Sequence, residues 1–369
     1  MGVEEEAAVL SVLRSGWISQ GPKVAEFERQ FAAYVGTPHA IALSSCTTAL
    51  HLAMLLAGIK EGDEVLCPSL SFIATANAIR YVGAAPVFVD IDPGTYNIDP
   101  NRVEEAITPR TRAILAVHQV GMPAAMNELG EIADRRGLVL MEDAACASGS
   151  KYMAERVGHP HSLLACFSFH PRKVLVTGEG GMITTADEQI AARAKRLRQH
   201  AMSVSDLARH SSSKIVSESY DEVGFNFRMT DMQAALGLVQ LQRLPGFLER
   251  RRARAAKYTA ALGQLPFFVP PGEPEGCVSN FQSYMVRMLE NAPITRDDLM
   301  QALLDRGIST RRGVMPIHRE RPYADPCWDA RLPETNRAAD RTIILPLFDQ
   351  MTDEDQDYVL DAILGVCRR

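Results

Sequence analysis

The sequence predicts an α/β fold built on a large, mainly parallel sheet of seven strands, followed by a smaller α+β domain. Between about residues 39 and 186, short apolar runs alternate with stretches of good helix formers. This alternation is typical of parallel strands that are joined by helical crossovers. The seven strand-like runs are HAIALS, DEVLCP, APVFVDI, RAILAVH, GLVLMED, LACFSF and GMITTA. Right-handed crossovers would bring the carboxyl ends of the strands to one edge of the sheet, where ligands bind in such folds.

The pattern changes near residue 230, and we place a domain boundary shortly after it. A long helix is predicted from about Asp231 to Leu265, because Thr230 and Gln233 have the spacing of a capping box. After the turn-rich segment FVPPGEPEG come a strand-like run, SYMVRML, a helix-like run that ends at Gly307, and a closing helix, DEDQDYVLDAIL. We therefore expect an N-terminal segment with a large domain over residues 1–244 and a small α+β domain over residues 245–369.

Composition excludes several classes of protein. The 369 residues include 39 basic and 45 acidic ones, a formal net charge of −6, with no basic block of the kind that follows nucleic acid. No apolar run approaches the roughly 18 residues that cross a bilayer, and the acidic start MGVEEEAAVL is unlike a signal peptide. The seven cysteines are odd in number and scattered, which disfavours a disulfide framework. We expect a cytoplasmic protein that binds neither nucleic acid nor membranes.

Two carboxylates, Glu142 and Asp143, end the apolar run GLVLMED. A carboxylate at the ligand-binding end of a buried strand is costly unless it has a charged or hydrogen-bonding partner. Such a position therefore indicates a functional site. The alternative is that both residues cap a following helix, which is a common use of acidic side chains.

A lysine follows the next strand-like run. In CFSFHPRK the strand gives way to a loop that carries Lys173, and a glycine-rich turn over residues 178–181 comes after it. A lysine amine attacks carbonyl groups when burial or nearby positive charge lowers its pKa, and such lysines form Schiff bases with pyridoxal 5′-phosphate (PLP). The alternative is the ordinary one, because most loop lysines are solvated surface charges.

Small and hydroxyl residues connect the first strand-like run to its helix. The segment SSCTTALH places Thr47 and Thr48 at the predicted start of that helix. Backbone N–H groups at a helix start attract phosphate, and threonine hydroxyls add further donors. Ordinary N-capping by serine or threonine would account for the same residues without a ligand.

Taken together and in this order, these segments resemble the DegT/DnrJ/EryC1/StrS family of PLP-dependent sugar aminotransferases. The resemblance covers nearly the whole chain. It rests on GWISQGPKVAEFERQFAAYVGTPHAIALSSCTTALHLA, GDEVLCPSLSFIATANAIRYVGAAPVFVDIDP, MEDAACASG, CFSFHPRKVLVTGEGGMITT, VGFNFRMTDMQAALGLVQL and RTIILPLFDQMT. Matches of this length are far more specific than one short motif. They imply the aspartate aminotransferase-like fold, which is PLP fold type I.

The resemblance implies a role for several residues by position. Lys173 matches the lysine that holds PLP as a Schiff base and moves a proton between the cofactor and the substrate carbon. Asp143 matches the aspartate that pairs with the pyridine nitrogen and keeps it protonated. Phe72 matches an aromatic residue stacked on the cofactor ring. The residues that match phosphate ligands are Thr47, Thr48 and Ser168.

The resemblance also implies a homodimer with shared active sites. Asn226, in the segment GFNFR, matches an asparagine that reaches the cofactor phosphate of the neighbouring subunit. Arg228 lies two residues further on, and we expect it to face the same interface, although an exposed arginine is usually only a solvated charge.

Several histidines are candidates for the site. His170 lies three residues before Lys173, and His318, in MPIHRERPY, resembles a histidine that the family places near the sugar. His159 and His161 form a His-Pro-His, but no cysteine or carboxylate completes a metal site of known spacing. We therefore predict no metal, and the predicted substrate contacts are His318, Arg228 and His170.

The chain departs from the family pattern at two places. Many members carry glutamine at the position of Cys146, where it contacts the ring oxygen of the cofactor. Cysteine is a weak hydrogen-bond partner, so we expect this contact to be lost or supplied by another group. The polar stretch over residues 202–221 resembles an insertion, which we interpret as a mobile loop near the substrate entrance.

The predicted reaction transfers an amino group from an amino acid, L-glutamate by resemblance, to a keto sugar attached to a nucleotide. Two alternatives stay open. Some relatives are PLP-dependent sugar dehydratases, but in those a histidine replaces the Schiff-base lysine, and here Lys173 is present. The other alternative is a non-catalytic, PLP-binding regulatory protein. The sequence leaves open the nucleotide, the aminated carbon (3 or 4) and a cyclitol as acceptor.

Overall fold

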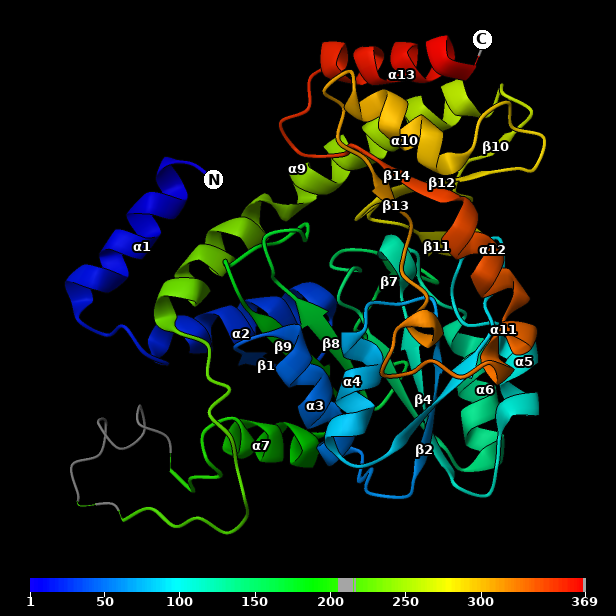
Figure 1. Ribbon diagram of the computed structural model, residues 1–369. Coiled ribbons are helices and arrows are strands. Elements are labelled where there is room, and N and C mark those ends of the chain that lie inside the picture. The colour runs from blue at the N-terminus through cyan, green and yellow to red at the C-terminus, as the bar shows by residue number, and fades with distance from the viewer. Residues whose placement is uncertain (205–214, 216, 368–369) are drawn as a thin grey trace.

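A seven-stranded sheet forms the centre of the larger part of the chain (Figure 1). The computed structural model describes residues 1–204, 215 and 217–367. The strands of this sheet are β1 (His39–Leu43), β2 (Glu64–Pro68), β3 (Ala85–Val89), β4 (Thr111–Val117), β5 (Val139–Asp143), β8 (Leu164–Ser168) and β9 (Gly181–Thr185). Their order across the sheet is β1-β9-β8-β5-β4-β2-β3. All the predicted strand-like runs are therefore confirmed as strands of one sheet.

The sheet is mainly parallel, as predicted, and β9 is its antiparallel member. It pairs in the antiparallel sense with both of its neighbours, β1 and β8. Parallel strands need a long crossover, usually a helix, and residues 169–180 between β8 and β9 contain none. The reversal pairs Ser168 at the end of β8 with Gly181 at the start of β9.

Helices cover both faces of this sheet (Figure 1). On one face lie α3 (Cys46–Leu56), α4 (Ala74–Tyr81) and α7 (Glu188–Leu197), and on the other lie α2 (Pro22–Val35), α5 (Pro100–Ala106), α6 (Met126–Arg136) and the first half of α9 (Asp231–Leu262). Successive strand residues point to opposite faces. In β1, Ile41 and Leu43 pack with α3 and α4, whereas Ala40 and Ala42 pack with α2 and α9.

Helix α9 connects the large domain to the C-terminal one. It begins with the predicted capping box, in which the backbone N–H of Gln233 donates to Oγ1 of Thr230 at 3.3 Å. The first half of the helix packs against the large sheet, while Ala255, Tyr258 and Leu262 lie in the core of the C-terminal domain. One continuous helix thus contributes to both cores, and the domain boundary at residues 244 and 245 stays a prediction.

The C-terminal domain contains a four-stranded antiparallel sheet. Its strands, in order, are β10 (Phe268–Val269), β12 (Tyr284–Met288), β14 (Thr342–Leu345) and β13 (Arg311–Arg312). Its helices are α10 (Arg296–Leu304), α11 (Cys327–Arg331), α12 (Pro333–Arg341) and α13 (Asp353–Cys367). The predicted strand SYMVRML is confirmed as β12, and the two predicted helices are confirmed as α10 and α13. Figure 1 shows α10 and α13 side by side at the end of the molecule farthest from the large sheet.

Smaller elements surround these domains. Helix α1 (Val3–Ser15) packs on α9, and a short sheet combines β6 (Lys151–Tyr152), β7 (Glu155–Arg156) and β11 (Cys277–Val278). Short 3₁₀ turns are η1 (Gln119–Gly121) and η2 (Ile317–Arg319). Of the predicted mobile loop over 202–221, residues 205–214 and 216 lie outside the described residues. No helix in the described part of the chain is long and apolar enough to span a membrane.

Candidate active site

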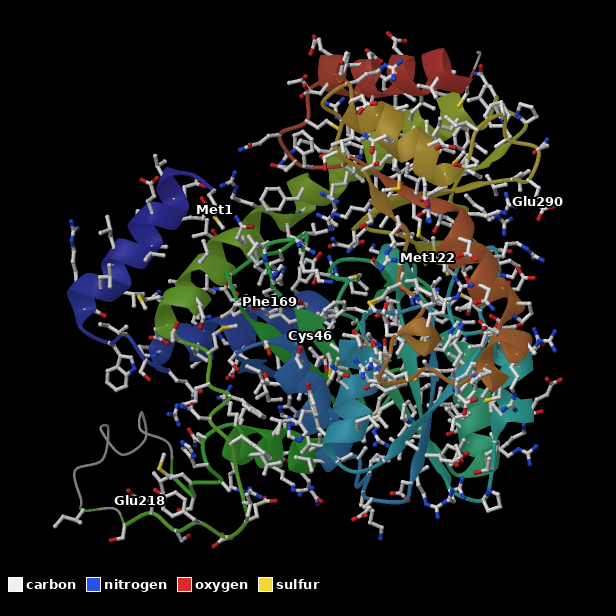
Figure 2. The ribbon with its side chains drawn as sticks, in the orientation of Figure 1. Met1, Cys46, Met122, Phe169, Glu218 and Glu290 are labelled. Carbon is white, nitrogen blue, oxygen red and sulfur yellow. The ribbon has the colours of Figure 1, made fainter. Side chains whose placement is uncertain are left out.

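The carboxyl ends of the parallel strands meet at one edge of the large sheet, and most of the predicted site residues lie there. Asp143 is the last residue of β5 and Ser168 is the last residue of β8. Thr47 and Thr48 lie in the first turn of α3, just after β1. Figure 2 shows Cys46, the first residue of α3, close to the middle of the molecule. Cys46, Asp143 and Ser168 are all buried, so protein encloses this part of the edge.

The carboxylate of Asp143 is buried and held in one orientation. Oδ2 accepts a hydrogen bond from Oγ1 of Thr75 at 2.8 Å, and Oδ1 accepts one from the backbone N–H of Ala145 at 3.2 Å. Burial raises the pKa of Asp143, and the two hydrogen bonds and the positive charge of Lys173 oppose that rise without cancelling it. The hydroxyl of Ser71 lies 2.7 Å from that of Thr75 and supports it.

The alternative that Glu142 and Asp143 cap a helix is wrong, because residues 144–150 form turns and no helix. Glu142 is paired instead with the buried ring of His118, whose Nε2 lies 2.8 Å from Oε2 of the carboxylate. Nδ1 of His118 accepts the backbone N–H of Ala124 at 3.0 Å, which leaves Nε2–H to donate to Glu142. Of the two adjacent carboxylates, Glu142 thus has an internal partner in the residue that follows β4, and Asp143 faces the loop of Lys173.

Lys173 directs its amine at a sulfur atom. Nζ of Lys173 lies 3.1 Å from Sγ of Cys146. Burial by itself lowers the pKa of Lys173, but the contact with Cys146 and the negative charge of Asp143 outweigh it, and the pKa is raised. The raised pKa favours the protonated amine, which has to give up a proton before it attacks a carbonyl group.

A close approach between α3 and β9 closes one side of the site. A Cβ atom on Gly181, the first residue of β9, would lie 2.4 Å from the carbonyl carbon of Ser45. Real Cβ atoms do not come so near to a backbone atom, so only glycine fits at this position. The strand can then lie directly against the amino end of α3.

Ser45 is the N-cap of α3. Its Oγ accepts the backbone N–H of Thr48 at 3.1 Å, and Oγ1 of Thr48 donates to the carbonyl oxygen of Ser45 at 2.8 Å. The hydroxyl of Thr48 is thus engaged in the cap, whereas the hydroxyl of Thr47 has no partner within the described residues. The capping alternative accounts for Ser45 and Thr48 and leaves Thr47 available to a ligand.

His170 shares the loop of Lys173, and its ring nitrogens contact other groups of the chain. Nδ1 of His170 accepts the backbone N–H of Arg172 at 3.2 Å, and Nε2 lies 4.0 Å from a carboxylate oxygen of Glu179. The His170 side chain is 42% exposed. Its predicted contact with the substrate stays a prediction.

Phe72 lies in the turn between β2 and α4, and its side chain is open to solvent. The residue is 68% exposed. It borders a cavity of about 470 Å³ that Arg311, Arg312 and Met315 also line. An exposed aromatic ring at the edge of a cavity is available to stack on a planar ligand.

His318 is buried and ties the C-terminal domain to the end of β2. Nδ1 lies 2.7 Å from Oγ of Ser69, and Nε2 lies 3.1 Å from Oδ1 of Asn336 and 3.3 Å from Oδ1 of Asp329. Burial lowers the pKa of His318. Both ring nitrogens of His318 thus have hydrogen-bond partners within the protein, and the ring fixes the loop that precedes Phe72. The predicted contact of His318 with the sugar stays a prediction.

Asn226 and Arg228 have no side-chain partner within the described residues. Asn226 is exposed, and Arg228 is half-buried. Their loop is fixed from both sides, because the backbone N–H of Ser44 donates to the carbonyl of Phe227 at 2.8 Å and Asn226 bridges to Gln199. The loop thus presents the side chain of Asn226 to the outside from a rigid base.

Sequence reasoning missed Ser71 and Thr75, the residues that orient Asp143. Both lie in the same segment as Phe72, SLSFIAT, and hydroxyls on a turn beside a predicted ligand are a weak signal for such a role. Nothing in the sequence indicates that this turn contacts β5. Among the described residues, no cluster of three or more His, Cys, Asp or Glu side chains could hold a metal ion.

Comparison with known proteins connects this site to a family. A family model described as the DegT/DnrJ/EryC1/StrS aminotransferase family matches residues 1–364. The spore coat polysaccharide biosynthesis protein SpsC of Bacillus subtilis is 40% identical, and the match covers 100% of this chain and 95% of SpsC. The solved structure of DesV from S. venezuelae is 37% identical with a TM-score of 0.90, covering 99% of this chain and 95% of DesV.

A further solved structure is the PLP form of Spr1654 from Streptococcus pneumoniae. It is 28% identical with a TM-score of 0.91, and the match covers 100% of this chain and 97% of that one. The fold is therefore the aspartate aminotransferase-like one that the sequence predicted. The chain belongs to the DegT/DnrJ/EryC1/StrS aminotransferase family and is a PLP-dependent sugar aminotransferase.

Proposed function

We propose that this enzyme moves an amino group from L-glutamate to a keto sugar attached to a nucleotide. The observation that carries the proposal is the presence at one sheet edge of a buried carboxylate, Asp143, held by two hydrogen bonds, and of a lysine amine, that of Lys173, in contact with Cys146. When bound there, PLP supplies an aldehyde that links to amines and a ring that takes up electrons from the substrate carbon.

The groups at this edge fit such a cofactor. The free hydroxyl of Thr47, the first turn of α3 and the hydroxyl of Ser168 suit a phosphate. The oriented carboxylate of Asp143 suits a protonated ring nitrogen, because charge-assisted hydrogen bonds are the strong ones. The exposed ring of Phe72 suits stacking on the pyridine. The amine of Lys173 suits the aldehyde.

The residues of the chain then divide the work. The amine of Lys173 would hold the aldehyde of the cofactor and, once free, would take a proton from the substrate carbon and return one in the second half of the reaction. The carboxylate of Asp143 would keep the ring nitrogen protonated. Cys146 gives the protonated amine of Lys173 a partner between these steps.

We propose a homodimer in which Asn226 serves the neighbouring subunit's cofactor phosphate. The proposal is supported by the family and by the exposed, unpartnered side chain of Asn226 on a fixed loop. Mixing two inactive variants tests it. A heterodimer of Lys173→Ala with Asn226→Ala has one site in which both residues are intact, so activity should reappear on mixing. If mixing restores nothing although mixed dimers form, Asn226 does not act across the interface.

A nucleotide on the acceptor is supported by two arginines of β13. Arg311 and Arg312 are exposed, line the cavity beside Phe72, and have no acidic partner within the described residues. Arginine binds phosphate oxygens in pairs of parallel hydrogen bonds. A sugar that carries a diphosphate would satisfy these side chains, whereas a neutral keto compound would leave them unpaired.

The donor half is tested by adding L-glutamate to the PLP-loaded protein and following the change of its absorbance to that of pyridoxamine phosphate. The acceptor half is tested by offering the pyridoxamine phosphate form a set of nucleotide-linked keto sugars and neutral keto compounds, including a cyclitol ketone. We expect turnover of the nucleotide-linked sugars. A product that has lost water without gaining an amine would favour the dehydratase alternative, which the presence of Lys173 disfavours.

A further inference from the structure

We propose that Cys146 and Lys173 form a covalent, thiol-reversible bridge when a hydroperoxide reaches the enzyme while the amine of Lys173 is free. Sγ of Cys146 lies 3.1 Å from Nζ of Lys173, and Cys146 is partly exposed. The two atoms that would bond are thus already in contact. The bridge would be a modification site built from a residue pair of the active site.

Cys146 has the surroundings of a reactive cysteine. The sulfur of Cys146 lies against the amine of Lys173, and a cysteine sulfur that reacts with peroxide does so as the thiolate. Cys146 is also partly exposed as a residue.

The other cysteines at this edge lack these surroundings. Cys46, Cys67 and Cys166 are buried, and burial raises the pKa of each of their thiols. Sγ of Cys46 instead contacts the backbone carbonyl oxygen of Cys166 at 3.8 Å. Buried thiols in neutral surroundings are inert.

Cys327 on α11 provides a natural comparison. It is exposed, but its neighbour is the carboxylate of Asp325, which raises the pKa of the Cys327 thiol. It is therefore accessible to peroxide without being activated. Exposure and a cationic neighbour coincide at Cys146, and an amine that can attack the oxidised sulfur is present there as well.

The chemistry balances with one molecule of hydrogen peroxide. The Cys146 thiolate is oxidised by two electrons to a sulfenic acid, and the peroxide is reduced to water. The amine of Lys173 then attacks the sulfur, so that an S–N bond forms, the S–O bond breaks and a second water leaves. The thiolate, the ammonium and one peroxide thus give the bridge and two waters. Two molecules of a thiol reductant would restore the thiol and the amine and leave as their disulfide.

The state of the cofactor should control the reaction. Covalently attached PLP occupies the amine of Lys173, whereas the amine is free in the cofactor-free chain and when the cofactor carries the amino group. The bridge removes the amine that the proposed transamination needs. This loss of activity rests on the proposed function, but formation of the bridge does not.

The test treats the full-length protein in its pyridoxamine phosphate form with hydrogen peroxide and measures intact mass and a peptide map. We expect a chain that is lighter by two hydrogen atoms, with the peptides of Cys146 and Lys173 joined, and a mass that returns to its starting value with dithiothreitol. The PLP-loaded form should cross-link more slowly than the pyridoxamine form.

Three variants make the result specific. Cys146→Ser should give no bridge, and Cys327→Ser should give it as fully as the wild type. Lys173→Met should give no bridge and should instead accumulate Cys146 sulfenic acid, which dimedone labels.

A loss of two hydrogen atoms that persists in Lys173→Met, or a cross-link that joins Cys146 to Cys46, would be a disulfide and would overturn the proposal. So would oxidation of Cys146 to the sulfinic acid with no joined peptide. If the bridge forms but L-glutamate never converts the cofactor, the proposed function fails and the bridge stands.

Discussion

The hydroxyl of Thr75 donates a 2.8 Å hydrogen bond to Oδ2 of Asp143, although the two residues are 68 positions apart in the sequence. Thr75 lies in the first turn of α4, just after Phe72, and Asp143 ends β5. The bond therefore connects the turn that carries the predicted stacking ring with the strand that carries the predicted partner of the ring nitrogen. It also lowers the pKa of a carboxylate whose pKa burial raises.

Replacing Thr75 with valine should reduce activity and shift its pH dependence. Without the hydroxyl, the pKa of Asp143 rises further, so the carboxylate becomes protonated at a higher pH and the acid limb of the kcat/KM profile moves upward. A hydrogen bond to a charged group is worth about 1.5–3 kcal/mol, so we expect a loss of roughly 10- to 100-fold. Thr75→Ser keeps the hydroxyl and should stay near wild type. An unchanged acid limb in Thr75→Val would show that this bond does not set the ionisation of Asp143.

Thr47 and Thr48 should behave differently although they are neighbours. Thr47→Val removes a hydroxyl with no partner in the described chain, so we expect PLP to bind roughly 10-fold more weakly with no change in the melting temperature of the cofactor-free protein. Thr48→Val removes the hydroxyl that donates to the carbonyl oxygen of Ser45 and accepts its backbone N–H, which should cost about 1 kcal/mol of folding stability even without the cofactor.

Fluorescence titration with PLP and thermal melting of the cofactor-free protein measure the two effects. The same loss of PLP affinity in both variants would mean that the Thr48 hydroxyl also binds the cofactor phosphate, in spite of its bonds with Ser45. Thr47→Ser is the matched control, because it keeps a hydroxyl at the position and should bind PLP as the wild type does.

The sequence predicted the positions of Lys173 and Asp143 well because both depend on local pattern. Each follows an apolar strand-like run, and the parallel arrangement brings the ends of such runs to one edge. The resemblance to a family then supplied roles that spacing could not. The antiparallel direction of β9 was not stated in advance, but it follows from the absence of a helix in residues 169–180.

The contacts between distant segments could not be predicted. The pairing of Glu142 with His118, the support of Asp143 by Thr75 and the contact of Lys173 with Cys146 each join residues from different loops or strands. Sequence reasoning treated Glu142 and Asp143 alike, as a pair at the end of a strand. Alternate strand residues point to opposite faces, and for that reason the two carboxylates meet different partners.

The ring of His318 should contribute to stability in a pH-dependent manner. It joins the C-terminal domain to Ser69, and His318→Ala removes the ring bonds and leaves the Ser69 hydroxyl with the backbone N–H of residue 318 alone, a cost of about 1–3 kcal/mol. Burial lowers the pKa of His318, so below about pH 6.5 the unfolded chain binds a proton that the folded chain does not.

The contribution of His318 is therefore fully present above that pH and is lost as the pH falls toward the lowered pKa of the folded state. Melting temperatures of the wild type and His318→Ala, measured from pH 8 down to about pH 5, should converge as the pH falls. A difference that stays constant over this range would mean that His318 keeps its ordinary pKa in the folded protein.

The covalent attachment of the cofactor at Lys173 is tested most directly by reduction. The PLP-loaded protein is treated with sodium borohydride and digested, and the peptides are sequenced by mass spectrometry, with Lys173→Met as the control. We expect the reduced cofactor on the peptide that carries Lys173 and on no other, and no label in the control. Label on a different lysine, or an unlabelled Lys173 in a protein that contains bound PLP, would contradict the assignment of this lysine and the reaction built on it.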